Sequence, residues 1–213
     1  AGLNLARHVG DEERCVERNR ALLAEELGAP VVFVDQVHSA EVHVLPATGE
    51  VPVRTADAMV TDRRDVALAI MVADCLPVLL SDPVAGVVAV AHAGRQGLLA
   101  GVLQRTIAAM TERGARAEQL EVSIGPSICG ACYEVPAALR EEAAALLPET
   151  WARTSWGTPS LDLRAGAAAV LEAAGVPRDA VDVEHPCTLE DERFYSYRRA
   201  PRTGRFAGVL RRV

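Results

Sequence analysis

Two histidines and a cysteine stand where short, mostly apolar runs of the chain give way to polar segments. His38 follows the run VVFVDQV, Asp74 and Cys75 follow VALAIMVA, and His92 follows GVVAVA. Side chains at the junction of a rigid strand and a loop are well placed to bind or react. Imidazole and thiolate are ligands that zinc prefers, and three protein ligands with an open fourth position are typical of catalytic zinc. Copper accepts the same ligand set.

The spacing of these three side chains does not by itself identify a metal site. His38 and Cys75 are 37 residues apart and Cys75 and His92 are 17 apart, which matches no local zinc motif. The side chains meet only if the fold brings them together. A cysteine beside apolar residues is more often a buried thiol than a ligand. The residue types and spacing are therefore compatible both with a metal site and with a purely structural role of these side chains.

The segment SICGACYEV contains a second group of thiols, Cys129 and Cys132, in a C-x-x-C arrangement. One such pair is half of a structural zinc site, and the sequence shows no matching second half. A thioredoxin-like redox motif would open a helix after the first strand of a βαβ unit, which is not its position here. We therefore expect a tight loop with two ordinary thiols.

The C-terminal stretch HPCTLEDERFYSYRRAPRTGRFAGVL is densest in polar groups, with Arg198, Arg199, Arg202 and Arg205 within eight residues. Such a run is commonly a solvated charged face. The alternative is an anion clamp, because the arginine fork matches phosphate and carboxylate groups. Both interpretations stay open.

Composition narrows the possible partners. The net charge is −7 and all 22 basic residues are arginine, so no lysine forms a Schiff base, and a nucleic-acid binder with a basic stripe is not expected. Five cysteines are too few, and odd in number, for a disulfide scaffold, which favours a reducing, cytoplasmic compartment. Because no run of 18 apolar residues occurs, we expect no membrane span.

The apolar pattern alternates between helical and strand character along the whole chain. Helical patterns occupy 11–27, 97–112, 136–147 and 161–174. Short apolar runs fill most of 58–92, and VVFVD, EVHVL, LEVSIG, VDVEH, FYSYRR and FAGVL are further strand candidates. Strands apolar on both faces indicate a sheet covered on either side. Without a repeat, linker or composition break, the sequence predicts one mixed α and β domain over residues 1–213.

Six segments in order carry a family resemblance: QVHS at 36–39, ADAMVTD at 56–62, VADCLPVLLSDP at 72–83, VAHAGRQG at 90–97, SIGPSICGACYEV at 123–135 and CTLEDERFYSYRRAPRTGRFAGVL at 187–210. Together they resemble the YfiH family, also called the laccase-domain or multicopper polyphenol oxidase family. The resemblance implies an α+β fold, a single-domain α/β/β/α layered sandwich, and a zinc site made by His38, Cys75 and His92.

Two departures from the family pattern bear on function. The family usually reads HAGWRG where this chain has Arg95 and Gln96 after His92-Ala93-Gly94, so a tryptophan that could stack on a substrate is replaced. An early Thr-Arg-Gly-Gly-Val-Ser segment of the family is missing ahead of Ala1, so we expect the extreme N-terminal segment to be absent from the sequence.

Family members have been assigned purine nucleoside phosphorolysis, adenosine deamination, polyphenol oxidation and removal of misincorporated serine from peptidoglycan precursors. The resemblance thus implies a zinc-dependent purine nucleoside phosphorylase, acting on adenosine, inosine, guanosine and methylthioadenosine, with adenosine deaminase activity. The small-molecule partners are a purine nucleoside and phosphate.

This hypothesis assigns a role to each candidate residue. Cys75, His92 and His38 bind the metal and are catalytic, and Asp74 or Asp35 moves protons. The arginines proposed to hold phosphate are Arg198, Arg199 and Arg205.

Three other functions are weighed against this one. In the first, Cys75 is a nucleophile activated by His92, in a hydrolase or amidase that edits serine-containing peptidoglycan precursors. The second, copper-dependent polyphenol oxidation, needs several coppers, for which five histidines are too few. The third, a metal staple in a binding module, conflicts with an open fourth position, since structural zinc sites are normally closed.

Overall fold

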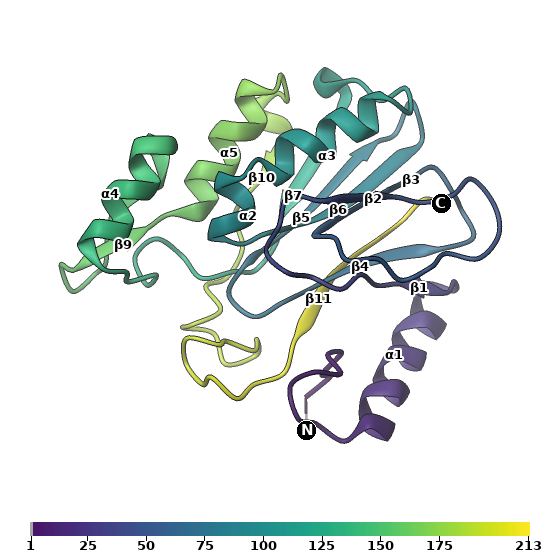
Figure 1. Ribbon diagram of the computed structural model, residues 1–213, viewed down its shortest axis with the longest axis horizontal. Coiled ribbons are helices and arrows are strands. Elements are labelled where there is room, and N and C mark those ends of the chain that lie inside the picture. The colour runs from purple at the N-terminus through teal and green to yellow at the C-terminus, as the bar shows by residue number, and fades with distance from the viewer. Residues whose placement is uncertain (1) are drawn as a thin grey trace.

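A six-stranded mixed sheet forms the centre of the fold, in the order β10-β7-β5-β6-β3-β2 (Figure 1). The computed structural model describes residues 2–213. The central strands are antiparallel, and β2 and β10 add in parallel at the two edges. Their bounds are β2 (Val42–Val44), β3 (Ala58–Thr61), β5 (Leu76–Asp82), β6 (Val87–Ala93), β7 (Glu121–Ile124) and β10 (Val181–Asp182).

A three-stranded sheet packs on one face of the central sheet. Its order is β1-β4-β11, with β1 (Val31–Val32), β4 (Ala67–Val72) and β11 (Phe206–Arg211). Met59 and Val90 of the central sheet meet Leu68 and Ile70 of β4 in an apolar layer between the two sheets. Every residue of β6 is buried, because the sheet is covered on both faces. A separate hairpin pairs β8 (Trp151–Arg153) with β9 (Pro159–Leu161).

Helices cover the outer faces of both sheets. The helices α3 (Val102–Thr111) and α5 (Leu163–Ala173) pack on the open face of the central sheet, and α1 (Glu13–Leu27) lies beyond the three-stranded sheet (Figure 1). This order of layers confirms the predicted α/β/β/α sandwich and the mixed α and β class. None of the helices among residues 2–213 is long and apolar enough to cross a bilayer.

Two further α-helices and several 3-10 turns complete the helical elements of residues 2–213. They are α2 (Arg95–Leu99), α4 (Ala137–Leu146) and the single 3-10 turns η1 (Ala117–Gln119), η2 (Pro148–Thr150) and η3 (Arg178–Ala180). The helix predicted over 97–112 was therefore wrong in extent, since two helices replace it. Gly101 lies between them with φ +90°, a conformation that glycine adopts without a steric cost and that ends a helix.

The strand predicted for FYSYRR was also wrong, because residues 194–199 form no strand and end in a turn at 197–199. The Arg199 guanidinium donates hydrogen bonds to the carbonyls of Thr188, Leu189 and Phe194, and the Arg199 backbone N–H donates to Ser196 Oγ. Side-chain bonds of this kind offer the backbone an alternative to a sheet ladder.

We expect substitutions in the apolar layer between the central sheet and the helices α3 and α5 to have large effects on the free energy of unfolding. Leu80 on β5 is fully buried in this layer, so Leu80→Ala should lower the free energy of unfolding by about 2–5 kcal/mol through lost burial and a new cavity. Val84→Ala is the control, because Val84 is 74% exposed and should change stability by less than about 0.5 kcal/mol. Urea unfolding measures both; equal losses would contradict this packing.

Candidate functional site

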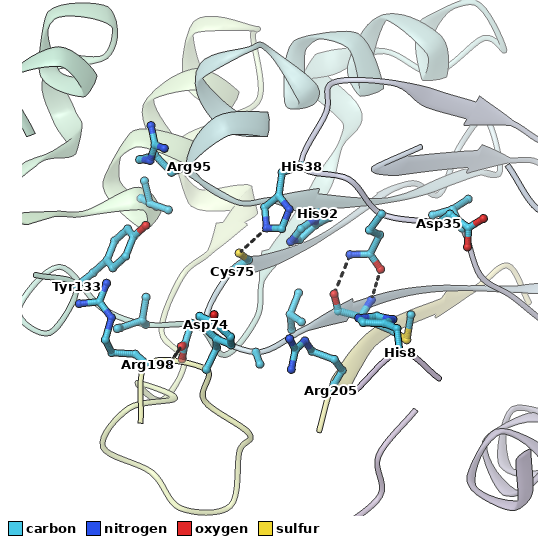
Figure 2. A pocket seen from close by; sticks show the side chains of 18 residues that line it. His8, Asp35, His38, Asp74, Cys75, His92, Arg95, Tyr133, Arg198 and Arg205 are labelled. Atoms are coloured by element: carbon cyan, nitrogen blue, oxygen red, sulfur yellow. Dashed lines mark hydrogen bonds between the residues drawn. The ribbon is translucent and has the colours of Figure 1, made fainter. Parts of the chain in front are cut away.

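His38, Cys75 and His92 lie together at one end of the space between the two sheets (Figure 2). Their ligand atoms are all within 4.8 Å of one another. Cys75 Sγ is 3.8 Å from His38 Nε2, and the two imidazole centroids are 4.7 Å apart. The fold thus brings together the three side chains that the sequence singled out, as a group able to hold a metal ion.

Strand geometry explains how two of the three meet. Side chains alternate across a strand, so His92 lies on the same face of β6 as Val88 and Val90, toward the three-stranded sheet. Cys75 directly precedes β5, and in the β5–β6 register Pro77 pairs with His92. His38 comes from the loop between β1 and β2.

Asp57, which directly precedes β3, connects the loop of His38 to His92. Its fully buried carboxylate accepts the backbone N–H groups of Val37, His38 and Ser39 at 3.2, 3.0 and 2.6 Å, and the Ser39 hydroxyl at 2.7 Å. The same carboxylate bonds His92 Nδ1 at 2.8 Å. This leaves His92 Nε2 as the free ring nitrogen, an arrangement typical of metal-binding histidines.

The charges of these groups depend on one another. Burial opposes ionisation of Asp57, but hydrogen bonds from His92 and Ser39 outweigh it and lower its pKa to about 2. Burial likewise opposes the charged form of His92, yet Asp57 and Cys75 raise its pKa to about 9. Contacts with His38 and His92 overcome burial at Cys75 and lower its pKa to about 6. These shifts favour a carboxylate at Asp57, an imidazolium at His92 and a thiolate at Cys75.

The backbone at the site is unusually constrained. A Cβ at Gly94 would stand 2.8 Å from His38 Cδ2 and 3.0 Å from Cys75 Sγ, so only glycine permits this approach of the β6–α2 turn. His38 and Asp74 have φ of +62° and +91°. Positive φ is rare outside glycine, and such strained residues cluster at active sites.

Asp74 binds the C-terminal segment to the site. Its carboxylate accepts the Thr188 hydroxyl and the Arg198 backbone N–H, each at 2.7 Å. Both oxygens are therefore engaged, which favours a positioning role for Asp74. The proton-transfer role assigned to it from the sequence stays a prediction.

A cavity of about 540 Å³ opens beside the three side chains, a size suited to a nucleoside-sized ligand. Besides the three, its polar and aromatic lining includes His8, Asp35, Arg95, Tyr133, Arg198 and Arg205 (Figure 2). Tyr197 also lines it. Sequence reasoning missed His8, Tyr133 and Tyr197 as lining residues. Tyr133 directly follows the C-x-x-C pair. Its place in a polar, glycine-containing loop was the only sequence feature that could have indicated a cavity residue.

The arginines predicted to hold phosphate separate into two groups. Arg198 and Arg205 line the cavity, whereas Arg199 does not and is held by backbone carbonyls of its own segment. Among residues 2–213, neither Arg198 nor Arg205 forms an ion pair with a carboxylate. Burial lowers the pKa of Arg205, so an anionic ligand would stabilise its charge.

Asp57→Asn should weaken metal retention at this site, because the neutral amide no longer orients and polarises His92. Loss of such a partner typically costs about 10- to 100-fold in metal affinity. Asp82→Asn is the matched control: Asp82 is a second buried aspartate, whose carboxylate accepts three backbone N–H groups far from the site. Zinc competition with a chelator should separate the two variants, even where both lose stability. Equal zinc retention would contradict this role of Asp57.

Known proteins resemble this chain over nearly its whole length. Residues 1–212 match the sequence model of a family described as multi-copper polyphenol oxidoreductase laccase. A Streptomyces coelicolor protein named purine nucleoside phosphorylase is 50% identical over 98% of this chain and 87% of its own length. A protein of an unknown prokaryotic organism, named adenosine deaminase, is 34% identical over 100% of this chain and 88% of its own.

The crystal structure of the protein YfiH from Bacillus licheniformis has the same fold. It superposes with a TM-score of 0.87 at 28% identity, covering 97% of this chain and 84% of that one. The resemblance carried by the six ordered segments is thereby confirmed. The chain therefore belongs to the multi-copper polyphenol oxidoreductase laccase family, which is the family of YfiH.

Proposed function

We propose that this protein is a zinc-dependent purine nucleoside phosphorylase, acting on adenosine, inosine, guanosine and methylthioadenosine, with adenosine deamination as a second activity. The observation that carries the proposal is one cavity lined by His38, Cys75 and His92 and also by Arg198 and Arg205, neither of which forms an ion pair with a carboxylate of residues 2–213. The printed names of the relatives at 50% and 34% identity support the same two activities.

The donor set fits zinc. For tetrahedral zinc with ordinary bond lengths, a sulfur and an imidazole nitrogen are about 3.6 Å apart, and Cys75 Sγ and His38 Nε2 are 3.8 Å apart. Copper accepts the same ligands. Against a multicopper centre, the two groups of residues able to hold a metal among residues 2–213 include only two histidines, His38 and His92.

When bound, zinc supplies Lewis acidity next to the substrate. Arg198 and Arg205 would bind phosphate and direct one of its oxygens at C1′ of the ribose. The new C1′–O bond forms as the C1′–N9 bond breaks, giving ribose 1-phosphate and a purine, which takes up the proton that phosphate gives up. Asp35 is the better placed proton carrier, because this exposed residue is among those that line the cavity and its carboxylate accepts no side-chain hydrogen bond from any described residue.

Aromatic side chains of the cavity offer a surface for the purine. Tyr133 and Tyr197 both line it, and flat rings stack favourably on a base. They supply what the tryptophan of the usual HAGWRG segment would have given. With water in place of phosphate, attack at the amino-bearing ring carbon of adenosine would release ammonia and give inosine.

One observation favours a second candidate, a cysteine hydrolase or amidase acting on a cell-wall peptide precursor. Asp57, His92 and Cys75 are in contact in the order of an orienting acid, a base and a nucleophile, and the pKa of Cys75 is lowered to about 6. On this hypothesis, metal-free protein forms a covalent acyl adduct at Cys75 with substrate, which intact-mass measurement detects.

The free thiols also indicate the cellular compartment in which the protein works. All five cysteines are free, and exposed or metal-binding thiols persist in a reducing compartment. We propose that the protein works in the cytoplasm.

Cys75→Ala should remove one zinc per chain and abolish phosphate-dependent release of adenine from adenosine, because the variant loses the sulfur ligand. Cys15→Ala is the control, since Cys15 is exposed and belongs to neither group of metal-capable residues. Elemental analysis and chromatography of the same samples measure both effects. Full turnover in Cys75→Ala would contradict the proposal.

The wild-type protein separates the candidate functions in the same assay. Adenine and ribose 1-phosphate formed only with phosphate support the phosphorylase. Inosine formed without phosphate, with no adenine in its presence, would leave the deaminase alone. Zinc without any nucleoside turnover, together with a trapped adduct at Cys75, would replace both by the hydrolase.

Arg205→Gln should raise the KM for phosphate by roughly 10- to 100-fold, the value of one charge-assisted hydrogen bond, while the KM for nucleoside changes little. Arg202→Gln is the matched control, because Arg202 is exposed and lies outside the cavity. Steady-state kinetics with varied phosphate test the pair. Equal phosphate KM values in both variants would remove Arg205 from the phosphate site.

A further inference from the structure

A second group of ligand-type side chains lies outside the cavity. Cys129, Cys132, Cys187 and Glu190 place three sulfur atoms and a carboxylate oxygen within 4.8 Å of one another. None of the four lines the substrate cavity. The expectation of a loop with two ordinary thiols at 129–132 was therefore incomplete, because the fold supplies further ligands from the C-terminal segment.

The two halves of the group have the same spacing. Cys129 and Cys132 form a C-x-x-C, and Cys187 and Glu190 form a C-x-x-E. Each half is a tight turn: the Cys132 N–H donates to the Cys129 carbonyl at 3.0 Å, and the Glu190 N–H donates to the Cys187 carbonyl at 3.2 Å. Paired turns of this kind are the usual framework of structural zinc sites.

Backbone contacts hold the two turns against each other. Ser127 and Cys187 form a parallel bridge, in which the Thr188 N–H donates to the Ser127 carbonyl at 3.0 Å. The Cys129 N–H donates to Cys187 Sγ at 3.4 Å, a contact that a thiolate strengthens. The Arg164 guanidinium adds bonds to both segments. The four ligands are thus positioned by the protein itself.

We propose that Cys129, Cys132, Cys187 and Glu190 form a second, structural metal site that binds zinc with three thiolates and one carboxylate. Four protein ligands complete a tetrahedron, so this site has no open position for substrate. Binding replaces three thiol protons and forms three zinc–sulfur bonds and one zinc–oxygen bond. Glu190 is exposed, which gives the ion a path of entry.

The position of the site indicates what the ion does. It joins the loop that carries Ile128 and Tyr133, both lining the cavity, to the segment in which Thr188 donates to Asp74. The ion would therefore fix two walls of the cavity relative to each other. This inference does not depend on the phosphorylase activity or on metal binding at Cys75.

The test is zinc stoichiometry of full-length variants purified with a reductant and without chelator. We expect two zinc ions per chain in the wild type, one in Cys75→Ala, one in the double variant Cys129→Ser/Cys132→Ser, and two in the control Cys15→Ser. No zinc in Cys75→Ala, with one in the wild type, would overturn the second site and leave the first intact. One zinc ion per chain in both the wild type and Cys75→Ala would support the second site and overturn metal binding at Cys75.

A spectroscopic measurement identifies the ligands independently. Cobalt(II) bound to Cys75→Ala should show thiolate-to-cobalt charge-transfer bands, which Cys187→Ser added to this variant should diminish. A mass two hydrogens below that of the free-thiol chain, with no cobalt bound, would instead show a disulfide and overturn the proposal.

A substitution at exposed Glu190 tests the site without altering a cysteine. Glu190→Gln should weaken zinc retention by at least about tenfold in competition with a chelator, by analogy with losses of supporting ligands. Glu192→Gln is the matched control, because Glu192 is exposed and lies outside the group. Equal retention in the two variants would remove Glu190 from the site.

Discussion

The fully buried carboxylate of Asp57 is the interaction on which the candidate active site depends. A charge removed from water is strongly destabilising unless hydrogen bonds and an opposite charge compensate. Here the loop containing His38 and Ser39 supplies three backbone N–H groups and a hydroxyl, and the His92 ring supplies a further hydrogen bond through Nδ1. These bonds hold His38 at a positive φ that the residue alone would not favour. One aspartate thus positions both histidines.

The stack of two sheets explains why this arrangement forms at the end of the gap between them. The strand β6 is buried along its whole length, so His92 continues an apolar row and meets its partners away from bulk water. Hydrogen bonds and ion pairs are stronger in such surroundings, and an unpaired group is more costly. The burial that stabilises the sandwich therefore also restricts His92 to the orientation in which it is hydrogen-bonded.

Much of the fold was predictable because its signals are local. Buried strands read as continuous apolar runs, and the helices show their three- and four-residue spacing, so the mixed α and β class followed from short segments. The order of the layers was expected only from the family resemblance. The residue types of His38, Cys75 and His92 were equally visible. Asp57 was not, because within ADAMVTD it reads as the polar start of a strand. Its partners come from loops that the sequence does not place.

Side-chain direction sets the other limit on prediction. Arg198, Arg199 and Arg205 are indistinguishable by type, yet only Arg198 and Arg205 line the cavity, although all three guanidinium groups donate to backbone carbonyls. Glu190 was invisible for a related reason. A search for the second half of a zinc site looks for cysteine or histidine pairs, whereas here the turn after Cys187 returns a carboxylate.

The segment 185–205 connects Asp74 to the cavity arginines Arg198 and Arg205. Its position suggests how one cavity would serve two reactions. Asp74 binds the segment beside Cys75, and the segment then presents Arg198 and Arg205 to the cavity. Phosphate bound by these arginines would exclude water from the ribose and favour cleavage of the glycosidic bond. With no anion bound, water enters and the purine ring becomes the site of attack. In the proposed function, occupancy of the two arginines therefore decides between phosphorolysis and deamination.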